Sequence, residues 1–196
     1  MIKLIDILKE LYDKNLIGPE YGEGGQHIVY KYGSDKIIKF SHYGKIGDNV
    51  KIFTKYPDIF PKVYDIGPDY AILEKLDDNK AYKEMWECTK SLFSTSSEIP
   101  PKNEYIAKLV QMPRIKGPNW YNSEMSQLMY NNLDDNELKS QLQKELPSNL
   151  YNSLIKNWYP LLQKVKNISW NLKIKKDIND ENFGYTPEGK LKMLDI

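Results

Sequence analysis

The end of the chain carries side chains suited to binding a metal ion. Asp177, Asn182 and Asp195 supply two carboxylates and one carboxamide, at separations of 5 (182 − 177) and 13 (195 − 182) residues. Strand-forming residues on both sides of a Pro187-Glu188-Gly189 turn predict a hairpin over residues 172–196 that can bring the three together. Their oxygen atoms suit Mg²⁺, which is usually held by one or two carboxylates together with substrate phosphates. Because Asp and Asn are also common turn residues, the pattern alone equally fits a hairpin without a ligand.

Lys39 is the second candidate for chemistry. It lies in a strand expected over residues 36–40, where alternation places Ile37 and Lys39 on one face. Ile38 and Phe40 then lie on the opposite face. A lysine held on a sheet face can contact an anionic ligand, although strand lysines are more often exposed to solvent.

Glycines precede this strand in the chain. Gly22, Gly24 and Gly25 lie just before strand-forming residues at 27–32, and Gly33-Ser34-Asp35 then turns the chain back. A glycine lets backbone N–H groups approach a ligand without a Cβ in the way. The segment therefore predicts a glycine-rich hairpin whose second strand carries the lysine.

Around these residues the first part of the chain, residues 1–76, predicts a small antiparallel sheet with one inserted helix. The inserted helix is expected to be capped by Asp48 or Asn49. A second hairpin follows it, with a turn at Gly67-Pro68-Asp69. The expected elements are a helix over residues 2–15, the glycine-rich hairpin, a helix over residues 48–56, and strands over residues 62–66 and 70–76.

The second part, residues 77–196, predicts mainly helices before the terminal hairpin. Residues 80–93 are expected to form a helix, residues 94–103 a linker, and residues 106–119 show no clear periodicity. The expected apolar side of the first helix consists of Tyr82, Met85, Trp86 and Phe93, with Cys88 nearby.

Two further stretches of the second part show helical spacing. Residues 122–146 are expected to form two helices broken near Asp134-Asp135-Asn136. Ser148 is expected to cap a third helix, in which Pro160 introduces a kink or a new start. The apolar residues with this spacing are Met125, Leu128, Met129, Leu133, Leu138, Leu142 and Leu146, followed by Leu154, Trp158, Leu161, Val165 and Ile168.

Composition limits the class of protein. With 28 basic and 27 acidic residues among 196, the net charge of +1 gives no general footprint for nucleic acid. The single cysteine excludes an internal disulfide framework, and no apolar run approaches the ~20 residues of a membrane span. A soluble cytoplasmic protein without a membrane or nucleic-acid partner is therefore expected. The abundance of Lys, Asn, Ile and Tyr resembles the usage of an AT-rich genome, such as that of a virus or a low-GC bacterium.

Taken in order, these motifs resemble those of the protein-kinase-like superfamily. Gly22-x-Gly24-x-x-His27-x-Val29 is similar to the glycine-rich loop Gly-x-Gly-x-x-Gly-x-Val, with His27 at the third glycine. Lys39 resembles the lysine of Val-Ala-Ile-Lys. Lys175-Lys176-Asp177-x-x-x-x-Asn182 resembles the catalytic loop His-Arg-Asp-x-x-x-x-Asn, and Leu194-Asp195-Ile196 resembles the start of Asp-Phe-Gly. Aminoglycoside-phosphotransferase-like enzymes share the plan Asp…Asn…Asp, so the resemblance supports the fold more than the substrate.

The resemblance implies that the chain binds ATP and Mg²⁺ and transfers phosphate. Asp177 would accept the proton of the attacking hydroxyl, and Asn182 and Asp195 would each hold a metal ion. Lys39 would pair with the α- and β-phosphates. The implied nucleotide contacts are Gly22, Gly24, Gly25, Val29, Ile37 and Lys39, with Leu73 as gatekeeper and Glu74 as first hinge residue.

The chain also departs from the family pattern. His and Arg of the catalytic loop are replaced by Lys175-Lys176, and a lysine cannot form a bidentate pair with a phosphorylated activation loop. The inserted helix has no glutamate to hold Lys39, so Asp48 is the nearest candidate. One residue follows Asp195. The resemblance therefore implies an α+β two-lobe fold whose helical C-lobe is reduced and lacks the activation segment, unless the sequence has been cut at residue 196.

Two hypotheses for function follow. The first is an ATP- and Mg²⁺-dependent phosphotransferase of minimal kinase-like form acting on protein hydroxyls, with residues 1–76 as N-lobe and residues 77–196 as C-lobe. The second is a nucleotide-binding pseudokinase or kinase-shaped adaptor that binds a host or partner protein through its Trp-, Tyr- and Met-rich insert. The first hypothesis is favoured because four motif residues are retained together: Lys39, Asp177, Asn182 and Asp195. A plain α+β domain with accidental matches is the third alternative.

Overall fold

A computed structural model describes residues 11–14, 16–23, 27–42, 46–92, 103–111, 125–172 and 178–194. The chain divides into two compact units, Met1–Leu76 and Asp77–Ile196. Most of the helix expected over residues 2–15 lies outside the described residues, and so does the expected linker apart from Asn103. The same holds for Gly24, Gly25, Asp177 and Asp195.

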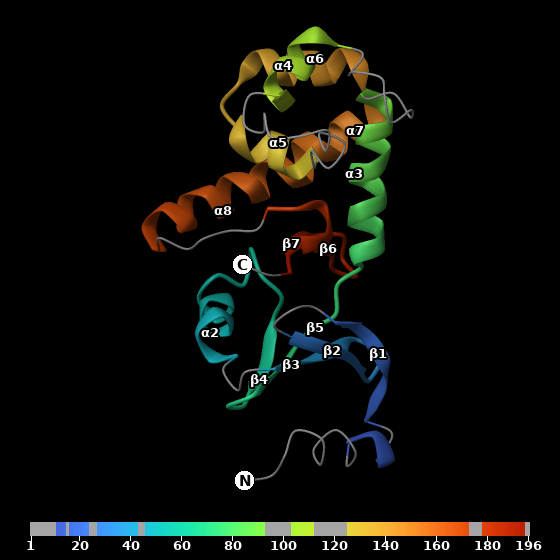
Figure 1. The fold of residues 1–196 in the computed structure, drawn as a ribbon, viewed down its shortest axis with the longest axis vertical. Helices are drawn as coiled ribbons and strands as arrows, with labels where there is room; N and C mark the ends of the chain where they lie inside the picture. The colour runs from blue at the N-terminus through green and yellow to red at the C-terminus, as the bar shows by residue number, and fades with distance from the viewer. Residues whose placement is uncertain are drawn as a thin grey trace. The chain divides into compact units, whose positions relative to one another are not determined.

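The first unit is built on a five-stranded antiparallel sheet with the strand order β1-β2-β3-β5-β4 (Figure 1). The turn between β2 and β3 contains Gly33, whose φ of 66° favours a residue without a Cβ. The expected turn at Gly67-Pro68-Asp69 joins β4 to β5. The strands are β1 Ile17–Glu23, β2 His27–Tyr32, β3 Lys36–Ser41, β4 Val63–Ile66 and β5 Tyr70–Glu74.

Strand β1 was not expected, because Gly18, Pro19 and Gly22 are poor strand formers. The segment nevertheless pairs with β2, and its register shifts twice between Ile17 and Gly22. It lies at the edge of the sheet, where a proline can be tolerated because one side of the strand needs no ladder bond.

Helix α2, Gly47–Lys55, lies between β3 and β4 in the chain. Its apolar side is buried as predicted at Val50 and Phe53, and the Phe53 ring stacks on Phe60 with 4.6 Å between the ring centroids. The predicted cap is wrong. Ile46 occupies the cap position without a side-chain hydrogen bond, because the helix begins before Asp48 and Asn49 and leaves both in its first turn.

The second unit is mainly helical and ends in a small hairpin. In the part that the structure describes, α3 packs against α5, α7, the turn η3 and strand β6. The elements are α3 Asp78–Leu92, α4 Glu104–Gln111, α5 Met125–Asn131, α6 Asn136–Glu145, α7 Ser148–Ser153, the π-helical turn η2 Leu154–Trp158, α8 Tyr159–Leu172, the 3-10 turn η3 Asp180–Asn182, β6 Phe183–Tyr185 and β7 Leu191–Met193. The α+β fold class is thereby confirmed, and an antiparallel sheet followed by a mainly helical unit is consistent with a kinase-like fold.

The buried side of α3 differs from the expected one. Ala81, Met85, Cys88 and Leu92 are buried at the helical spacing i, i+4, i+7 and i+11. Tyr82 and Trp86, which were predicted to be buried, are 43% and 47% exposed. The prediction gave weight to the large aromatic rings, whereas the buried stripe is rotated by one position and includes the small residues Ala81 and Cys88. Phe93 lies outside the described residues.

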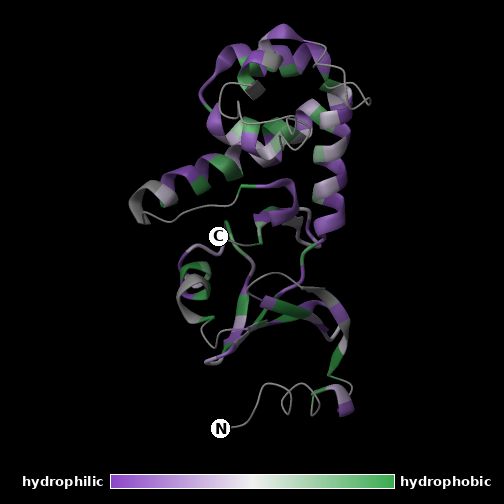
Figure 2. Cartoon of the chain, in the orientation of Figure 1, coloured by the Kyte–Doolittle hydropathy of each residue, from purple (hydrophilic) through white to green (hydrophobic). Residues whose placement is uncertain are grey.

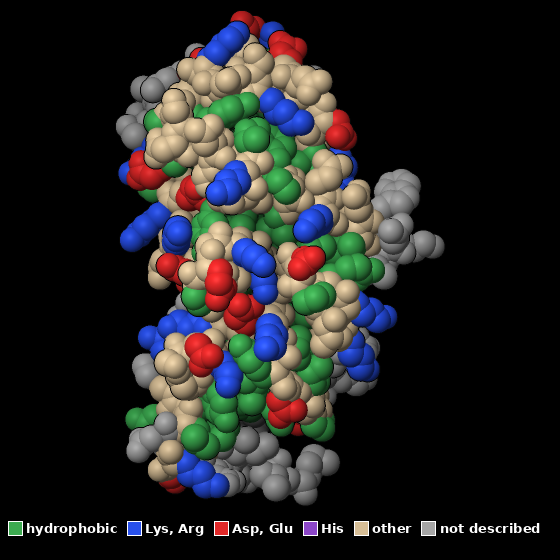
Figure 3. Space-filling view, turned by 180° about the vertical axis from the view of Figure 1, so that it is seen from behind, with side chains coloured by type: hydrophobic (Ala, Val, Ile, Leu, Met, Phe, Trp, Pro, Cys, Tyr) green, Lys and Arg blue, Asp and Glu red, His purple; other side chains and the backbone are tan. Residues whose placement is uncertain are grey.

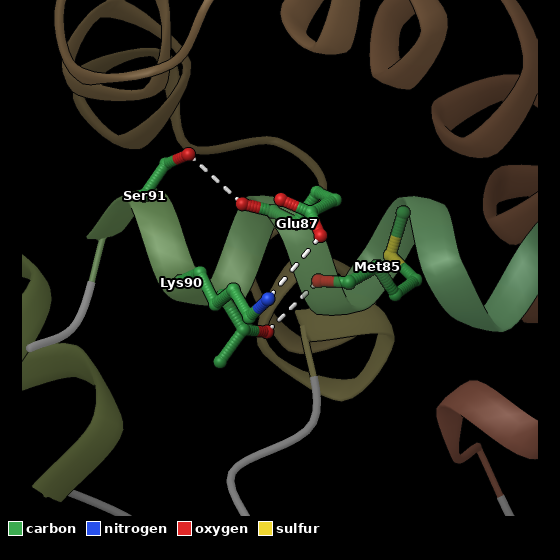
Figure 4. A network of polar contacts seen from close by, with 5 residues as sticks. Met85, Glu87, Lys90 and Ser91 are labelled. Atoms are coloured by element: carbon green, nitrogen blue, oxygen red, sulfur yellow. Dashed lines mark hydrogen bonds and ion pairs between the residues drawn. The ribbon is translucent and has the colours of Figure 1, made fainter. Parts of the chain in front are cut away.

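The polar side chains near the C-terminal end of α3 bond within the helix (Figure 4). The hydroxyls of Thr89 and Ser91 donate to the carbonyl oxygens of Met85 and Glu87, at 2.9 and 2.8 Å. Lys90 Nζ lies 3.4 Å from Glu87 Oε1 in an exposed ion pair. Because exposed pairs contribute little to stability, the buried stripe is the side of α3 that holds the unit together.

The break between α5 and α6 lies where it was predicted. Asp135 caps α6, since its Oδ1 accepts a hydrogen bond of 2.9 Å from the Leu138 N–H. Helix α4 was missed, although Asn103 gives a cap signal by accepting from the Tyr105 N–H at 2.8 Å. All seven apolar residues predicted over residues 122–146 are buried: Met125, Leu128, Met129, Leu133, Leu138, Leu142 and Leu146.

Helix α7 leads through the π-helical turn η2 into α8 without a break. In a regular α-helix, Pro160 would crowd the carbonyl four residues earlier and could not donate a hydrogen bond to it, because proline has no N–H. The π-helical turn lies just before Pro160, and its backbone is wider than that of an α-helical turn. The predicted cap at Ser148 is wrong, because Pro147 occupies the cap position and makes no side-chain bond. Figure 2 shows apolar and polar stretches along α8, as expected for a helix with one buried side.

The surface mixes both signs of charge. On the face drawn in Figure 3, Lys side chains lie among Asp and Glu side chains, as the near-neutral net charge suggests. Within the described part of the chain, no helix is both long enough and apolar enough to cross a membrane.

Candidate functional site

A single row of paired residues crosses the sheet of the first unit. Gly22 in β1 pairs with Val29 in β2, Val29 pairs with Lys39 in β3, and Lys39 pairs with Ala71 in β5. Residues that are directly opposite in antiparallel strands share a face. The register thus sets the motif glycine, valine and lysine side by side, although 17 residues (39 − 22) separate the first from the last.

The next row of the same face holds two more of the predicted residues. Ile37 pairs with Lys31 on β2 and with Leu73 on β5. Ile37 and Leu73 are buried. Since Ile37 is two positions from Lys39, both rows lie on the same face. Val29, Ile37, Lys39 and Leu73 therefore form one contiguous surface, in which Lys39 is the only charged residue of the four. Lys31, which is opposite Ile37, adds a second ammonium to the same face.

Lys39 is deeply placed, with 9% of its surface exposed. Lysines are rarely buried to this extent, because removing an ammonium from water is costly unless an anion or hydrogen-bond acceptors compensate it. Its partner Ala71 is fully buried and carries the smallest side chain after glycine, so little bulk stands opposite the lysine in this row.

The opposite face of the sheet is an apolar core. Ile17, Ile38 and Phe40 are buried there, and the Tyr30 ring meets Phe40 edge-on with 6.2 Å between centroids. The Tyr70 ring packs against Phe40 at the same centroid distance of 6.2 Å. The alternation predicted for β3 is therefore present, and the face with the lysine is chemically distinct from the face with the core.

Glu74 is tied to the chain just before β4. Its N–H donates to the Lys62 carbonyl oxygen at 2.8 Å, and its carboxylate Oε2 accepts from the Lys62 N–H at 3.0 Å. The backbone N–H of Glu74 is therefore already engaged. Any contact of the Glu74 backbone with a ligand would have to use its carbonyl oxygen.

In the second unit, the predicted terminal hairpin is formed by β6 and β7. Phe183 pairs with Met193 and Tyr185 with Leu191, and Gly189 makes the turn with a φ of 80°. The Leu194 N–H donates to the Asn182 carbonyl oxygen at 2.8 Å and extends the ladder beyond the strands. The open end of the hairpin thus joins Asn182, which is half-buried, to the residue that precedes Asp195.

Asp180 fixes the segment that leads to Asn182. Its carboxylate is buried and accepts from the Ser126 N–H at 2.9 Å and the Met125 N–H at 3.3 Å, both at the start of α5. Burial raises the pKa of this carboxyl above its usual value. Asn179 Oδ1 accepts from the Glu181 N–H at 3.0 Å. Sequence reasoning missed Asp180, because nothing near it in the chain shows that α5 lies beside it.

Tyr185 is held by α3 and by the π-helical turn. Its hydroxyl donates to Glu84 Oε2, which also accepts from the Trp158 indole N–H at 2.8 Å. Burial, and next the Glu84 carboxylate, raise the pKa of Tyr185 to about 12, so the phenol remains a donor at neutral pH. The Trp158 ring packs on Phe183 with 4.9 Å between centroids. No local pattern of residues indicates this network.

The donor chemistry at the hairpin fits a hard cation in part. The Asn182 carboxamide oxygen is a suitable ligand for Mg²⁺, and the open end of the hairpin is where residue 195 follows the Leu194–Asn182 bond. The other two predicted oxygen ligands, Asp177 and Asp195, lie outside the described residues. Among the residues that are described, no group of three His, Cys, Asp or Glu side chains is arranged to hold a metal ion.

The chain resembles known proteins in structure and not in sequence. No protein family matches the sequence, and no curated protein is similar to it. Among solved structures, the streptomycin–ATP–APH(2″)-IIa ternary complex is similar at 10% sequence identity over 100% of this chain and 71% of that chain, with a TM-score of 0.34.

Proposed function

We propose that the protein binds ATP with Mg²⁺ and transfers the terminal phosphate to a protein hydroxyl. The observation that supports this most is the row Gly22, Val29, Lys39 and Ala71 across the sheet. The resemblance of Gly22, Val29 and Lys39 to the family motifs rests on their order in the sequence alone. The direct pairing of Gly22, Val29 and Lys39, each in a different strand, is a separate fact, which an accidental match would not require.

The lysine-bearing face suits a nucleotide. Phosphoryl transfer depends mainly on positioning and on neutralising charge, so a cation fixed on a rigid sheet is the group it needs. Lys39 would contact the phosphates, and the apolar surface of Ile37 and Leu73 would cover the base. Gly22, in the row with Lys39, leaves the backbone accessible to phosphate oxygens because it has no Cβ.

The hairpin of the second unit would supply the metal ligands. Asn182 and Asp195 would hold Mg²⁺, and Asp177 would accept the proton of the attacking hydroxyl. The bond between Leu194 and Asn182 supports this assignment, because it brings the ends of the two hairpin strands together. When bound, Mg²⁺ would neutralise the charge that develops on the transferred phosphate.

The proposal is tested by incubating the protein with γ-labelled ATP, Mg²⁺ and a cell lysate. We expect Asp177→Asn to abolish labelling, because the amide cannot accept the hydroxyl proton. Asp134→Asn is the matched control, since Asp134 is an exposed carboxylate in the turn between α5 and α6 and its substitution should leave labelling unchanged. Equal labelling by the wild type and Asp177→Asn would overturn the assignment.

A nucleotide-binding adaptor without transfer is the second candidate. The observation that favours it is the exposure of Tyr82 and Trp86, one helical turn apart on α3, because exposed aromatic rings are typical of protein interfaces. The two candidates are separated by one result. Stabilisation by ATP with Mg²⁺ in the absence of any labelled product would favour the adaptor, whereas labelling that depends on Asp177 would favour the enzyme.

A further inference from the structure

Glu84 joins three elements of the second unit through one carboxylate oxygen. Oε2 accepts from the Trp158 indole N–H of the π-helical turn at 2.8 Å and from the Tyr185 hydroxyl of β6. Glu84 itself lies on α3. The partners are 74 and 101 residues away in the chain, so the contact closes two long loops.

The two donors lie in the interior of the unit. Trp158 and Tyr185 are buried, and Asn157 Nδ2 lies 3.4 Å from the Tyr185 hydroxyl and donates to Ser153 Oγ at 3.0 Å. A buried donor that loses its acceptor retains the full cost of desolvation. Removing the Glu84 carboxylate would therefore leave both donors without their acceptor at once.

The same network holds strand β6, which begins directly after Asn182. Phe183 packs on the Trp158 ring and Tyr185 bonds to Glu84, so one side of β6 is held at two points. The backbone of Tyr185 also exchanges two hydrogen bonds with Asp77, at 2.8 and 3.1 Å. Lys80 Nζ lies 4.7 Å from the centroid of the Tyr185 ring.

We infer that Glu84 is a positioning residue for the terminal hairpin: through Trp158 and Tyr185 it fixes β6 and, with it, the place of Asn182. Glu84 is half-buried, and a carboxylate withdrawn from water to this extent adds little stability beyond what well-packed apolar groups of similar size would give. A satisfied polar network instead selects one arrangement of the elements that it joins. The π-helical turn that delivers Trp158 agrees with this, because such turns occur frequently at functional sites.

Three variants of the full chain test the inference by amide hydrogen exchange without any ligand. Glu84→Leu removes the acceptor at nearly constant size, and Tyr185→Phe removes one donor and serves if Glu84→Leu fails to fold. Both are expected to speed exchange of the Leu194 amide, which bonds to Asn182, by about tenfold. Glu84→Gln should stay near the wild type, because the single oxygen of the amide can take the place of Oε2 and accept both bonds.

Tyr105→Phe is the matched control in the same unit. The Tyr105 hydroxyl also donates to a carboxylate, that of Asp135, but its partner caps α6 and has no bond to the hairpin. Exchange should then accelerate at the Leu138 amide and remain unchanged at Leu194. Unchanged exchange at Leu194 in both Glu84→Leu and Tyr185→Phe would overturn the inference.

A second measurement tests whether the position of Asn182 affects Mg²⁺ binding, and this part rests on the proposed function. Glu84→Leu should raise the Mg²⁺ concentration for half-maximal stabilisation by ATP about tenfold, while the affinity for ATP in EDTA stays unchanged, and Glu84→Gln should restore the wild-type value. An unchanged Mg²⁺ requirement in Glu84→Leu would show a purely structural role and overturn the link to the metal. If the wild type itself shows no response to Mg²⁺ while Leu194 exchange accelerates in the variants, the proposed function fails and the positioning role stands.

Discussion

The two units hold their candidate residues by different means. In the first, the row from Gly22 to Ala71 is set by the backbone ladder of four strands. In the second, the segment around Asn182 depends on side chains distant in sequence, because Asp180 bonds to Ser126 across 54 residues and Tyr185 bonds to Glu84 across 101. A ladder tolerates the loss of one side chain, whereas a network of single contacts does not. The lysine face should therefore resist mutation of its neighbours better than the hairpin does.

The largest expected effect is the protection of Cys88, the only cysteine of the chain, which reports on the second unit alone. Its thiol is fully buried, and burial, with Glu84 nearby, raises its pKa to about 12. We expect a thiol reagent at pH 8 to label the native protein on the order of a thousandfold more slowly than the chain unfolded in guanidinium. Rapid labelling in native buffer would show that this unit is looser than the sheet unit.

The same thiol gives a pH dependence of stability. Its pKa is higher in the folded state than the ordinary value of 9.0, so the unfolded chain loses this proton first as the pH rises. The stability that the protonated thiol contributes is complete below pH 9 and is lost progressively between pH 9 and about 12. In denaturant titrations over this pH range, the unfolding free energy of Cys88→Ala should therefore fall less than that of the wild type.

Lys39→Met is expected to have the next largest effect. Removing the charge from the row should lower phosphate transfer by about 100- to 1000-fold, the scale seen when one preorganised electrostatic contact is lost. Folding should be preserved, because the methionine keeps the stem and the ladder is unchanged. Lys36→Met on the same strand is the control, since residue 36 faces the opposite side of β3. An equal loss in both variants would break the assignment of the face.

A further prediction separates the buried and exposed sides of α3. Met85→Ala should lower the free energy of unfolding by about 3 kcal/mol, since it empties a fully buried position. Trp86→Ala, at the next residue but about half exposed, should cost less than about 0.5 kcal/mol. Denaturant titration measures both. A loss at Trp86 as large as that at Met85 would restore the stripe that the sequence predicted, which contained both residues, and would contradict the one that the structure shows.

The smallest expected effect compares one turn from each unit. Gly33→Ala and Gly189→Ala place a Cβ at φ values of 66° and 80°, and nothing lies within 4 Å of either new atom. Backbone strain is then the whole cost, about 1 kcal/mol for each. Asn at either position should cost less, because it tolerates the left-handed region. A clearly larger loss at Gly189, measured by thermal unfolding, would show that the hairpin turn has a contact that the sheet turn lacks.

Sequence periodicity predicted most of the described elements. Strand alternation gave the two faces of β3, and helical spacing gave the buried residues of α5 and α6, because both patterns are local. Caps failed at Asp48 and Ser148, since a capping residue is defined by where the first turn begins, and this shifts by one or two residues without changing the periodicity.

The side-chain contacts that hold the terminal hairpin could not be predicted from the sequence. The contact of Glu84 with Tyr185 and that of Asp180 with Ser126 join residues that no local pattern relates. The motif residues Val29 and Lys39 could be found because their order is fixed within two adjacent strands. Residues that hold such a motif in place from another element carry no comparable spacing, so only the folded chain reveals them.

The most direct test of the central claim is thermal unfolding of the wild type with ATP, with and without Mg²⁺. If the protein binds ATP with Mg²⁺, the ligand should raise the midpoint temperature of unfolding. The stabilisation should correspond to about 2.7 kcal/mol at a ligand concentration one hundred times the Kd. Asn182→Ala should lose the part of this shift that depends on Mg²⁺ and retain the part due to ATP alone. An unchanged midpoint of the wild type in ATP and Mg²⁺ would contradict the account.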